Sequence, residues 1–290
     1  MLIIGASGFI GSYLATEAEK NSLGYMGTAR NEICSKNVHF DLKTDRIKDI
    51  IDEIVRDGKL KVAVICAAIS KIDYCKANFE ESYFINVTTT KQLIDELDEY
   101  GFKIVFLSTD NVFDGEKGHY SEEDEVHPIN EYGCQKREIE KYLISRNKNH
   151  LVLRLSKVVG HNRFEPHPFD EWFELATQKK EICCIKGNIF SPTYIIDVAR
   201  GILRSIEQDL VGIYHLCNNE YFSRYDLAMK FIDYFGFHSS VCEKDLTDFR
   251  FLDNRPLKTN MCGDKFKYAT GFGFTPMKTV MSEMKARIGK

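Results

Sequence analysis

Tyr132 and Lys136 are residues whose types and spacing could carry out acid–base chemistry. They lie four positions apart on a predicted helix, so both side chains project from one face. A phenol has a pKa of about 10 in water and reacts sluggishly at neutral pH, but an ammonium group one turn away stabilises the phenolate and lowers that pKa. The pair suits proton donation to a ketone, although any helix can carry Tyr and Lys at this spacing.

A second group of polar residues, Ser108, Thr109 and Asp110, directly follows the apolar run Lys103–Leu107. If that run is a strand, the three residues lie at the carboxyl edge of a sheet, where open α/β folds bind their ligands. A hydroxyl at this edge could bind and polarise a substrate carbonyl. This placement strengthens the interpretation of the Tyr–Lys pair.

Glycines at positions 5, 8 and 11 follow the apolar run Met1–Ile4. They would let the backbone turn sharply and approach a pyrophosphate, whose charge free amides and the helix dipole would stabilise. A lone glycine pattern also fits a structural turn, but its position after the first strand favours a dinucleotide site. The predicted cofactor contacts here are Gly5, Ser7, Gly8, Phe9, Ile10 and Gly11.

The tip of the second predicted strand, near Thr28, is where an Asp or Glu would bind the adenosine ribose of NAD. Arg30 stands there instead. A guanidinium suits a 2′-phosphate, so NADP is favoured over NAD, with a surface arginine as the alternative interpretation. Asp41, after the run Val38–Phe40, could accept a hydrogen bond from the adenine amine.

Alternating apolar runs and helical segments predict the elements that position these residues. The fold class is α/β: a doubly wound, Rossmann-like parallel sheet. The expected strands are Met1–Ile4, Gly24–Thr28, Lys61–Cys66, Lys103–Leu107 and His150–Leu155. The expected helices are Phe9–Asn21, Arg46–Arg56, Asn78–Tyr100 and Asn130–Ser145.

After about Val158 the alternation of apolar runs and helical segments becomes less regular. Gly160–Pro168 and Lys186–Pro192 are expected to be loops, and Ile195–Ile206 and Ser223–Phe235 helices. We therefore divide the chain into a dinucleotide-binding domain, residues 1–157, and a smaller α/β substrate-binding lobe, residues 158–290. Some segments of the second lobe are expected to return to the first.

Composition excludes several classes of protein. With 290 residues, 43% hydrophobic, the chain can bury a sizeable core, and its net charge of −4 provides no basic field for nucleic acid or an anionic membrane. No apolar run of about 18 residues and no signal peptide are seen, so a cytoplasmic protein is expected. Nine scattered cysteines predict reduced thiols, with Cys183 and Cys184 as core filler rather than a metal site.

The glycine pattern, the Tyr132–Lys136 pair and the intervening Ser/Thr resemble the extended short-chain dehydrogenase/reductase family. Within it, residues 107–115 resemble the STDYVFDG stretch of the dTDP-4-dehydrorhamnose reductases, and residues 190–199 resemble their SPT-containing segment. Arg255-Pro256 matches the arginine–proline pair of their substrate lobe. Together these motifs span residues 1 to about 260.

The resemblance implies a role for each matching residue. Thr109 would be the hydroxyl partner and Tyr132 the acid, while Lys136 would tune Tyr132 and bind the nicotinamide ribose. Asn111 replaces the family's Tyr, which puts the sugar specificity in doubt. The remaining implied contacts are Ala67, Ala68, Asn86 and Ser108 with the cofactor, and Asp110, Asn111, Asn162 and Arg255 with the substrate. For Asn162, a polar surface loop is an equally good interpretation.

The implied activity is NADPH-dependent reduction of a nucleotide-activated 4-keto sugar, for deoxysugar or cell-surface polysaccharide synthesis. The oligomeric state stays open, with a homodimer as one option. One alternative is an NAD-dependent sugar-nucleotide epimerase or dehydratase, although dehydratases usually carry Asp-Glu beside the Thr, where this chain has Asp110-Asn111. Another is a non-catalytic NADP-binding subunit resembling the β subunit of methionine adenosyltransferase, against which the intact Thr109, Tyr132 and Lys136 weigh.

Overall fold

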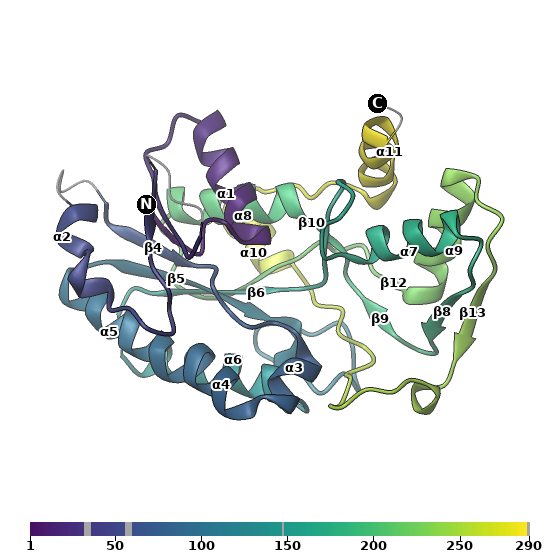
Figure 1. The fold of residues 1–290 in the computed structure, drawn as a ribbon, viewed down its shortest axis with the longest axis horizontal. Coiled ribbons are helices and arrows are strands. Elements are labelled where there is room, and N and C mark those ends of the chain that lie inside the picture. The colour runs from purple at the N-terminus through teal and green to yellow at the C-terminus, as the bar shows by residue number, and fades with distance from the viewer. Residues whose placement is uncertain (32–35, 56–59, 147, 289–290) are drawn as a thin grey trace.

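The computed structural model describes residues 1–31, 36–55, 60–146 and 148–288, and its centre is a seven-stranded parallel sheet (Figure 1). The strand order is β11-β6-β5-β4-β1-β2-β3. The order reverses between β1 and β4, which creates the crevice where ligands of such sheets bind. The predicted fold class is therefore confirmed. The strands are β1 (Leu2–Ile4), β2 (Met26–Ala29), β3 (Asn37–His39), β4 (Val62–Ile65), β5 (Lys103–Thr109), β6 (Leu151–Leu155) and β11 (Gly212–Leu216).

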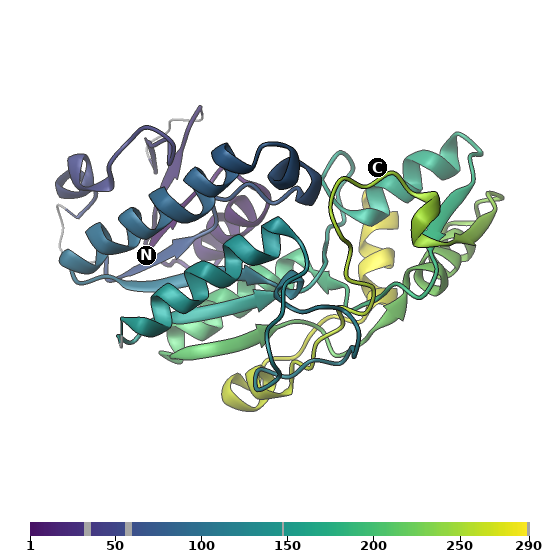
Figure 2. The ribbon, with the colours of Figure 1, turned by 90° about the horizontal axis from the view of Figure 1, so that it is seen from below.

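Helices cover both faces of the sheet because consecutive strand residues point to opposite sides. On one side, Ile3 packs with α1 (Phe9–Lys20) and α8 (Ile195–Glu207). On the other, Ile4 packs in a core with α5 (Thr90–Glu99) and α6 (Glu131–Ser145). Figures 1 and 2 show these two layers with the sheet between them.

Two predicted helices differ in the structure. The segment Arg46–Arg56 forms a 3₁₀ turn (Ile47–Asp49) and the short α2 (Ile51–Ile54), and Arg56 lies outside the described residues. The segment predicted as one helix over 78–100 comprises α4 (Phe79–Tyr83), a π-helical stretch (Phe84–Thr89) and α5, and is preceded by α3 (Ile72–Ala77). The hydroxyls of Thr89, at the end of the π-helical stretch, and of Thr90, at the start of α5, both donate to the carbonyl of Ile85, which is the kind of side-chain competition that loosens a helical turn.

The second lobe has its own aromatic core, in which the Phe169 and Phe231 rings lie 5.3 Å apart beside buried Trp172. Strands β8 and β13 form a parallel pair. Cys184 is buried there, as predicted, but Cys183 is half-buried and faces Cys242, so its interpretation as core filler is wrong. The elements are β7 (Val158–Val159), α7 (Pro168–Thr177), β8 (Ile182–Ile185), β9 (Ile189–Phe190), β10 (Thr193–Tyr194), β12 (Phe222–Ser223), α9 (Arg224–Phe235), β13 (Val241–Lys244), the 3₁₀ turn Leu246–Asp248 and α11 (Met277–Ile288).

Segments after residue 158 also contribute to the first lobe. Strand β11 pairs with β6 at the edge of the large sheet, α8 packs along α1, and α10 (Asp264–Thr270) inserts Phe266 into the same core. The boundary at residue 157 stays a prediction. Among the helices of the described residues, none has both the length and the apolar character needed to cross a bilayer.

A buried ion pair joins α6 to the sheet. The guanidinium of Arg154, on β6, donates two hydrogen bonds of 3.0 Å to the carboxylate of Glu140, on α6. The hydroxyl of Ser108, on β5, donates a third at 2.6 Å. Glu140 and Arg154 have only 0% and 1% of their surface exposed. Because a buried charge is costly unless paired, this network fixes the helix against the strands.

We expect Arg154→Met to lower the free energy of unfolding by about 3–5 kcal/mol, because it leaves the buried Glu140 carboxylate with Arg137, 3.3 Å away and partly exposed, as its remaining counterion. Urea denaturation measures the change. The matched control is Asp209→Asn, whose pair with Lys103 has an 83% exposed carboxylate and should be worth less than about 1 kcal/mol. Equal small losses in the two variants would contradict a structural role for the buried pair.

Candidate active site

The glycine turn leaves the start of α1 open to a ligand. Gly5 has φ +88°, a conformation that L side chains rarely adopt, and a Cβ on Gly11 would lie 2.2 Å from the Gly5 carbonyl oxygen. Helix α1 therefore packs closely on the turn. Its first turn contains no acidic residue and no side chain caps its N-terminus. The free amides and the positive end of the helix dipole can accept a phosphate.

The tips of β2 and β3 carry the two residues predicted to reach the adenosine end of a dinucleotide. Arg30 directly follows β2 and is exposed, and no described residue forms a hydrogen bond or ion pair with its guanidinium. Its carbonyl is bonded to the His39 ring at 2.8 Å, which joins the two strand tips. Asp41 is half-buried, and one oxygen of its carboxylate accepts a hydrogen bond from the Lys43 amide.

The segment after β4 lies beside the glycine turn. The Ala67 amide donates to the Ile4 carbonyl at 3.0 Å, and a Cβ on Gly5 would lie 3.0 Å from that of Ala67. Ala68 is exposed in the same segment. Asn86 has a different role from the one expected. Its carboxamide bonds both the amide and the carbonyl of Ile69, so it holds this segment in place from within the protein.

The three predicted catalytic residues meet at the carboxyl end of β5. Thr109 is the last residue of that strand, and its hydroxyl donates to Asp110 at 3.1 Å and lies near enough to the phenol of Tyr132, on the first turn of α6, to lower the pKa of that phenol. The Lys136 ammonium lies 5.9 Å from the centre of the Tyr132 ring and 4.5 Å from that of Phe106. It donates a 2.8 Å hydrogen bond to the Leu107 carbonyl. One proton donor, one hydroxyl and one buried cation thus share this site.

The protonation of the pair differs from the expectation. Burial raises the pKa of Tyr132 above its usual value, and the charges of Asp110 and Cys75 raise it further, while Thr109 lowers it. The prediction that Lys136 lowers this pKa is wrong for the chain alone, because the ammonium is directed to the Leu107 carbonyl. Burial lowers the pKa of Lys136 to about 8. At neutral pH the phenol keeps its proton and most of the lysine is charged.

Asn111 links the Thr109 segment to the start of α6. Its amide donates to Asp110 at 2.8 Å and to Thr109 at 3.3 Å, and its oxygen accepts from the Asn130 side chain. Asn130 in turn caps α6 by accepting from the Gly133 amide. A Cβ on Gly133 would lie 2.1 Å from the Asn111 carbonyl oxygen, so only glycine permits this approach.

Ser108 and Asp110, the neighbours of Thr109, are both buried. The Ser108 hydroxyl donates to Glu140, so it is not directed to a cofactor as expected, because the buried carboxylate requires donors. Burial raises the pKa of Asp110, while hydrogen bonds from Thr259, Thr109 and Asn111 and the charge of Lys157 oppose the change.

Asn162 contacts a different part of the molecule. Its amide donates to Tyr13 of α1 at 2.6 Å and to Glu165 at 2.9 Å, and its oxygen accepts from Arg287 of α11. These contacts place it between α1 and α11 and do not bring it together with Tyr132.

Arg255 belongs to a segment of residues 251–255 that we call the strap. The Arg255 guanidinium lies 2.8 Å from the carboxylate of Asp73 on α3, which also accepts hydrogen bonds from the Leu252 and Asp253 amides. The Asp253 carboxylate accepts from the amide of Glu131, the first residue of α6. The strap thus attaches the second lobe to two helices of the first lobe. The ion pair between Arg255 and Asp73 is one of the contacts that make this attachment.

Lys157 and Arg224 are site candidates that the sequence analysis missed. Lys157 follows β6, and its exposed side chain lies where the charges of Asp110, from the first lobe, and of Arg224 and Glu171, from the second, act on it. Desolvation of its ammonium by the protein around it lowers the pKa of Lys157, the charge of Arg224 lowers it further, and the carboxylates of Asp110 and Glu171 oppose the change. The sequence position of Lys157 could have identified it, because it follows a predicted strand and therefore lies at the same edge of the sheet as Thr109.

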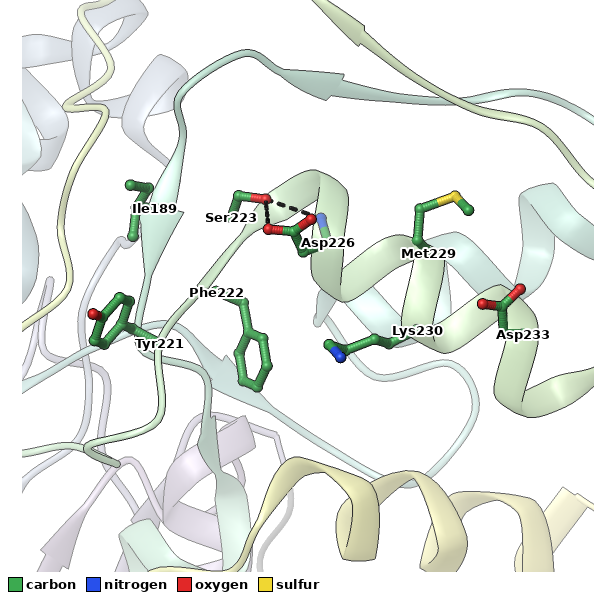
Figure 3. Close-up of a pocket in the computed structure, with 8 residues that line it drawn as sticks. All are labelled: Ile189, Tyr221, Phe222, Ser223, Asp226, Met229, Lys230 and Asp233. Atoms are coloured by element: carbon green, nitrogen blue, oxygen red, sulfur yellow. Dashed lines mark hydrogen bonds between the residues drawn. The ribbon is translucent and has the colours of Figure 1, made fainter.

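The second lobe also has a groove of about 580 Å³ (Figure 3). It lies at the start of α9, where the Ser223 hydroxyl accepts from the Asp226 amide and donates to its carboxylate. No residue predicted for the acid–base site lines this groove. Its lining residues are Ile189, Tyr221, Phe222, Ser223, Asp226, Met229, Lys230 and Asp233.

Comparisons with known proteins agree with this geometry. The family model described as the RmlD substrate binding domain matches residues 1–289. A dTDP-4-dehydrorhamnose reductase of Aggregatibacter actinomycetemcomitans is 28% identical, over 95% of this chain and 94% of its own length. The methionine adenosyltransferase 2 subunit beta of Danio rerio is also 28% identical, over 83% of this chain and 75% of its own.

Among solved structures, the dTDP-4-dehydrorhamnose reductase of Bacillus anthracis in complex with NADP has the same fold, with a TM-score of 0.85 and 22% identity over 99% of this chain and 98% of that one. The match of the family model over nearly the whole chain decides the classification. The chain belongs to the RmlD substrate-binding domain family, within the extended short-chain dehydrogenases/reductases.

Proposed function

We propose that the chain is an NADPH-dependent reductase that reduces the keto group of a nucleotide-activated 4-keto sugar, with Tyr132 as proton donor. The observation that carries the proposal is the meeting of Thr109, Tyr132 and Lys136 at the end of β5. The similarity to named dTDP-4-dehydrorhamnose reductases supports the substrate class.

The first lobe has the groups that a dinucleotide needs. The turn from Gly5 to Gly11 would take the pyrophosphate at the start of α1, and Arg30 would bind the 2′-phosphate of NADPH. Lys136 would bind the nicotinamide ribose beside Tyr132. When bound, NADPH supplies the hydride.

The protonation states fit reduction. Tyr132 holds its proton at neutral pH because burial raises its pKa, so it can donate to the far more basic oxygen that forms from a ketone. The Thr109 hydroxyl would hydrogen-bond the same oxygen. To stabilise the phenolate left behind, the charged Lys136 would have to turn from the Leu107 carbonyl towards Tyr132, because opposite charges favour each other's ionised form.

The substrate would lie between the lobes. Lys157, with charged neighbours from both lobes, is placed to bind the diphosphate of a sugar nucleotide, and Arg224 lies at the start of α9 nearby. Asp110 and Asn111 would form the sugar side of the site. We further propose a cytoplasmic setting, which the free state of the described cysteines supports.

A second candidate is a non-catalytic regulatory subunit, which the similarity to methionine adenosyltransferase 2 subunit beta favours. Such a subunit would bind NADP without turnover. Activity distinguishes the two proposals.

We expect the wild type to oxidise NADPH with one member of a panel of 4-keto-sugar nucleotides, and Tyr132→Phe to lower kcat by at least about 100-fold through loss of general acid catalysis. The affinity for NADPH should be nearly unchanged. Tyr142→Phe is the matched control, because Tyr142 lies on the same helix and donates to Asp95. Unaltered turnover in Tyr132→Phe would refute its role, and a wild type inert with the whole panel would favour the regulatory subunit.

Arg30→Ala should weaken NADPH binding by about 10- to 150-fold and change NADH binding little, since one charge-assisted contact to phosphate contributes about 1.5–3 kcal/mol. Titrating both cofactors by their fluorescence tests this. Arg250→Ala removes another exposed arginine, from the second lobe, and should have no effect. Equal losses for the two cofactors would show that Arg30 does not recognise the phosphate.

Lys157→Met should raise the KM for the nucleotide sugar about tenfold or more, because it removes a cation from the proposed diphosphate site. The dissociation constant of NADPH should stay as in the wild type. Steady-state kinetics with each ligand varied in turn measures both, with the exposed Lys278→Met as control. If the affinity for NADPH changed while the KM for the nucleotide sugar did not, Lys157 would bind the cofactor and not the sugar nucleotide.

A further inference from the structure

Two cysteines and a carboxylate meet on one face of the β8–β13 pair. Cys183 and Cys242 are directly opposite each other in the parallel register, and their Sγ atoms lie 3.5 Å apart. The carboxylate of Glu181, just before β8, lies 3.7 Å from the Cys183 sulfur. The pair is half-buried, so a small ion can reach it from solvent.

We propose that Glu181, Cys183 and Cys242 bind one thiophilic divalent cation, with Zn²⁺ as the best fit. The three ligand atoms lie within 4.8 Å of one another. Around a tetrahedral Zn²⁺, with bonds of about 2.3 Å to sulfur and about 2.0 Å to oxygen, two sulfurs are separated by roughly 3.8 Å and a sulfur and an oxygen by roughly 3.5 Å. The separations of 3.5 and 3.7 Å approach these values, so the site needs little rearrangement.

The charges also fit. Each thiol gives up its proton on binding, so two thiolates and one carboxylate surround the ion with three negative charges, one more than Zn²⁺ neutralises. The Lys244 ammonium, 3.9 Å from the Glu181 carboxylate, offsets the remainder. The Ser240 hydroxyl donates to the other oxygen of that carboxylate at 3.2 Å and would orient it, as outer partners of metal ligands commonly do.

The location suggests what the ion would do. Strand β13 leads through the turn Leu246–Asp248 into the strap, which contacts α3 and the start of α6. Three protein ligands leave a fourth position for water, and none of the three belongs to the acid–base site. The ion would hold β13 against β8 and thereby fix the position of the strand that leads into the strap.

The test is a titration of the reduced full-length chain with Co²⁺, in the presence of a phosphine reductant. We expect one equivalent to produce thiolate-to-cobalt charge-transfer absorption, which Zn²⁺ then displaces. Cys183→Ser and Cys242→Ser should each abolish this absorption, while Glu181→Gln should keep it at weaker affinity. Cys134→Ser, which removes an exposed thiol on α6, is the matched control and should titrate like the wild type.

Thermal unfolding provides a second readout, in which Zn²⁺ should raise the Tm of the wild type and leave that of Cys242→Ser unchanged. NADPH binding by each variant verifies that it has folded. The proposal is overturned if the reduced wild type shows no thiolate absorption, or if the absorption survives in Cys183→Ser and Cys242→Ser. A pair that forms a disulfide in air and ignores Co²⁺ once reduced would likewise overturn it.

Discussion

One face of α6 carries the constraint on which the active site depends. Tyr132, Lys136 and Glu140 follow one another at intervals of four residues, and the last two bring opposite charges into the protein interior. A buried charge without a partner is costly, so the helix must place Lys136 at the Leu107 carbonyl and Glu140 at Arg154. These two contacts fix how deeply α6 packs against the sheet and how it is rotated about its own axis. Tyr132 reaches Thr109 as a result.

Two further attachments hold the start of this helix. The side chains of Asn111 and Asn130 join it to the end of β5, at a contact so close that position 133 must be glycine. The strap joins it to the second lobe through Asp253. Tyr132, the proposed proton donor, is therefore positioned by β5, by the cap and by the lobe that would bind the sugar. Asn111, which replaces the family's Tyr, has become part of this support.

The sequence predicted the parts that depend on local pattern. Five of the seven strands of the sheet, the glycine turn and the meeting of Thr109, Tyr132 and Lys136 follow from apolar runs, glycine spacing and helical periodicity, whereas β3 and β11 were not among the expected strands. The hydrogen-bond partners of buried polar side chains could not be predicted in this way. Asn86 and Ser108 are polar residues at the expected places, but their side chains satisfy Ile69 and Glu140, contacts that exist only once distant segments pack. Helices α7, α10 and α11 were not predicted, because apolar runs and helical segments do not alternate regularly in the second half of the chain.

The strand order has a consequence for synthesis on the ribosome. Strand β6 is an open edge until β11, whose last residue is Leu216, has been translated, and α1 lacks its cover until α8 follows. The nascent first half would thus present unpaired backbone groups and an apolar helix face, features that promote aggregation. Translation must pass residue 216 before the sheet of the first lobe is complete, so residues 1–157 alone do not form the whole of this lobe.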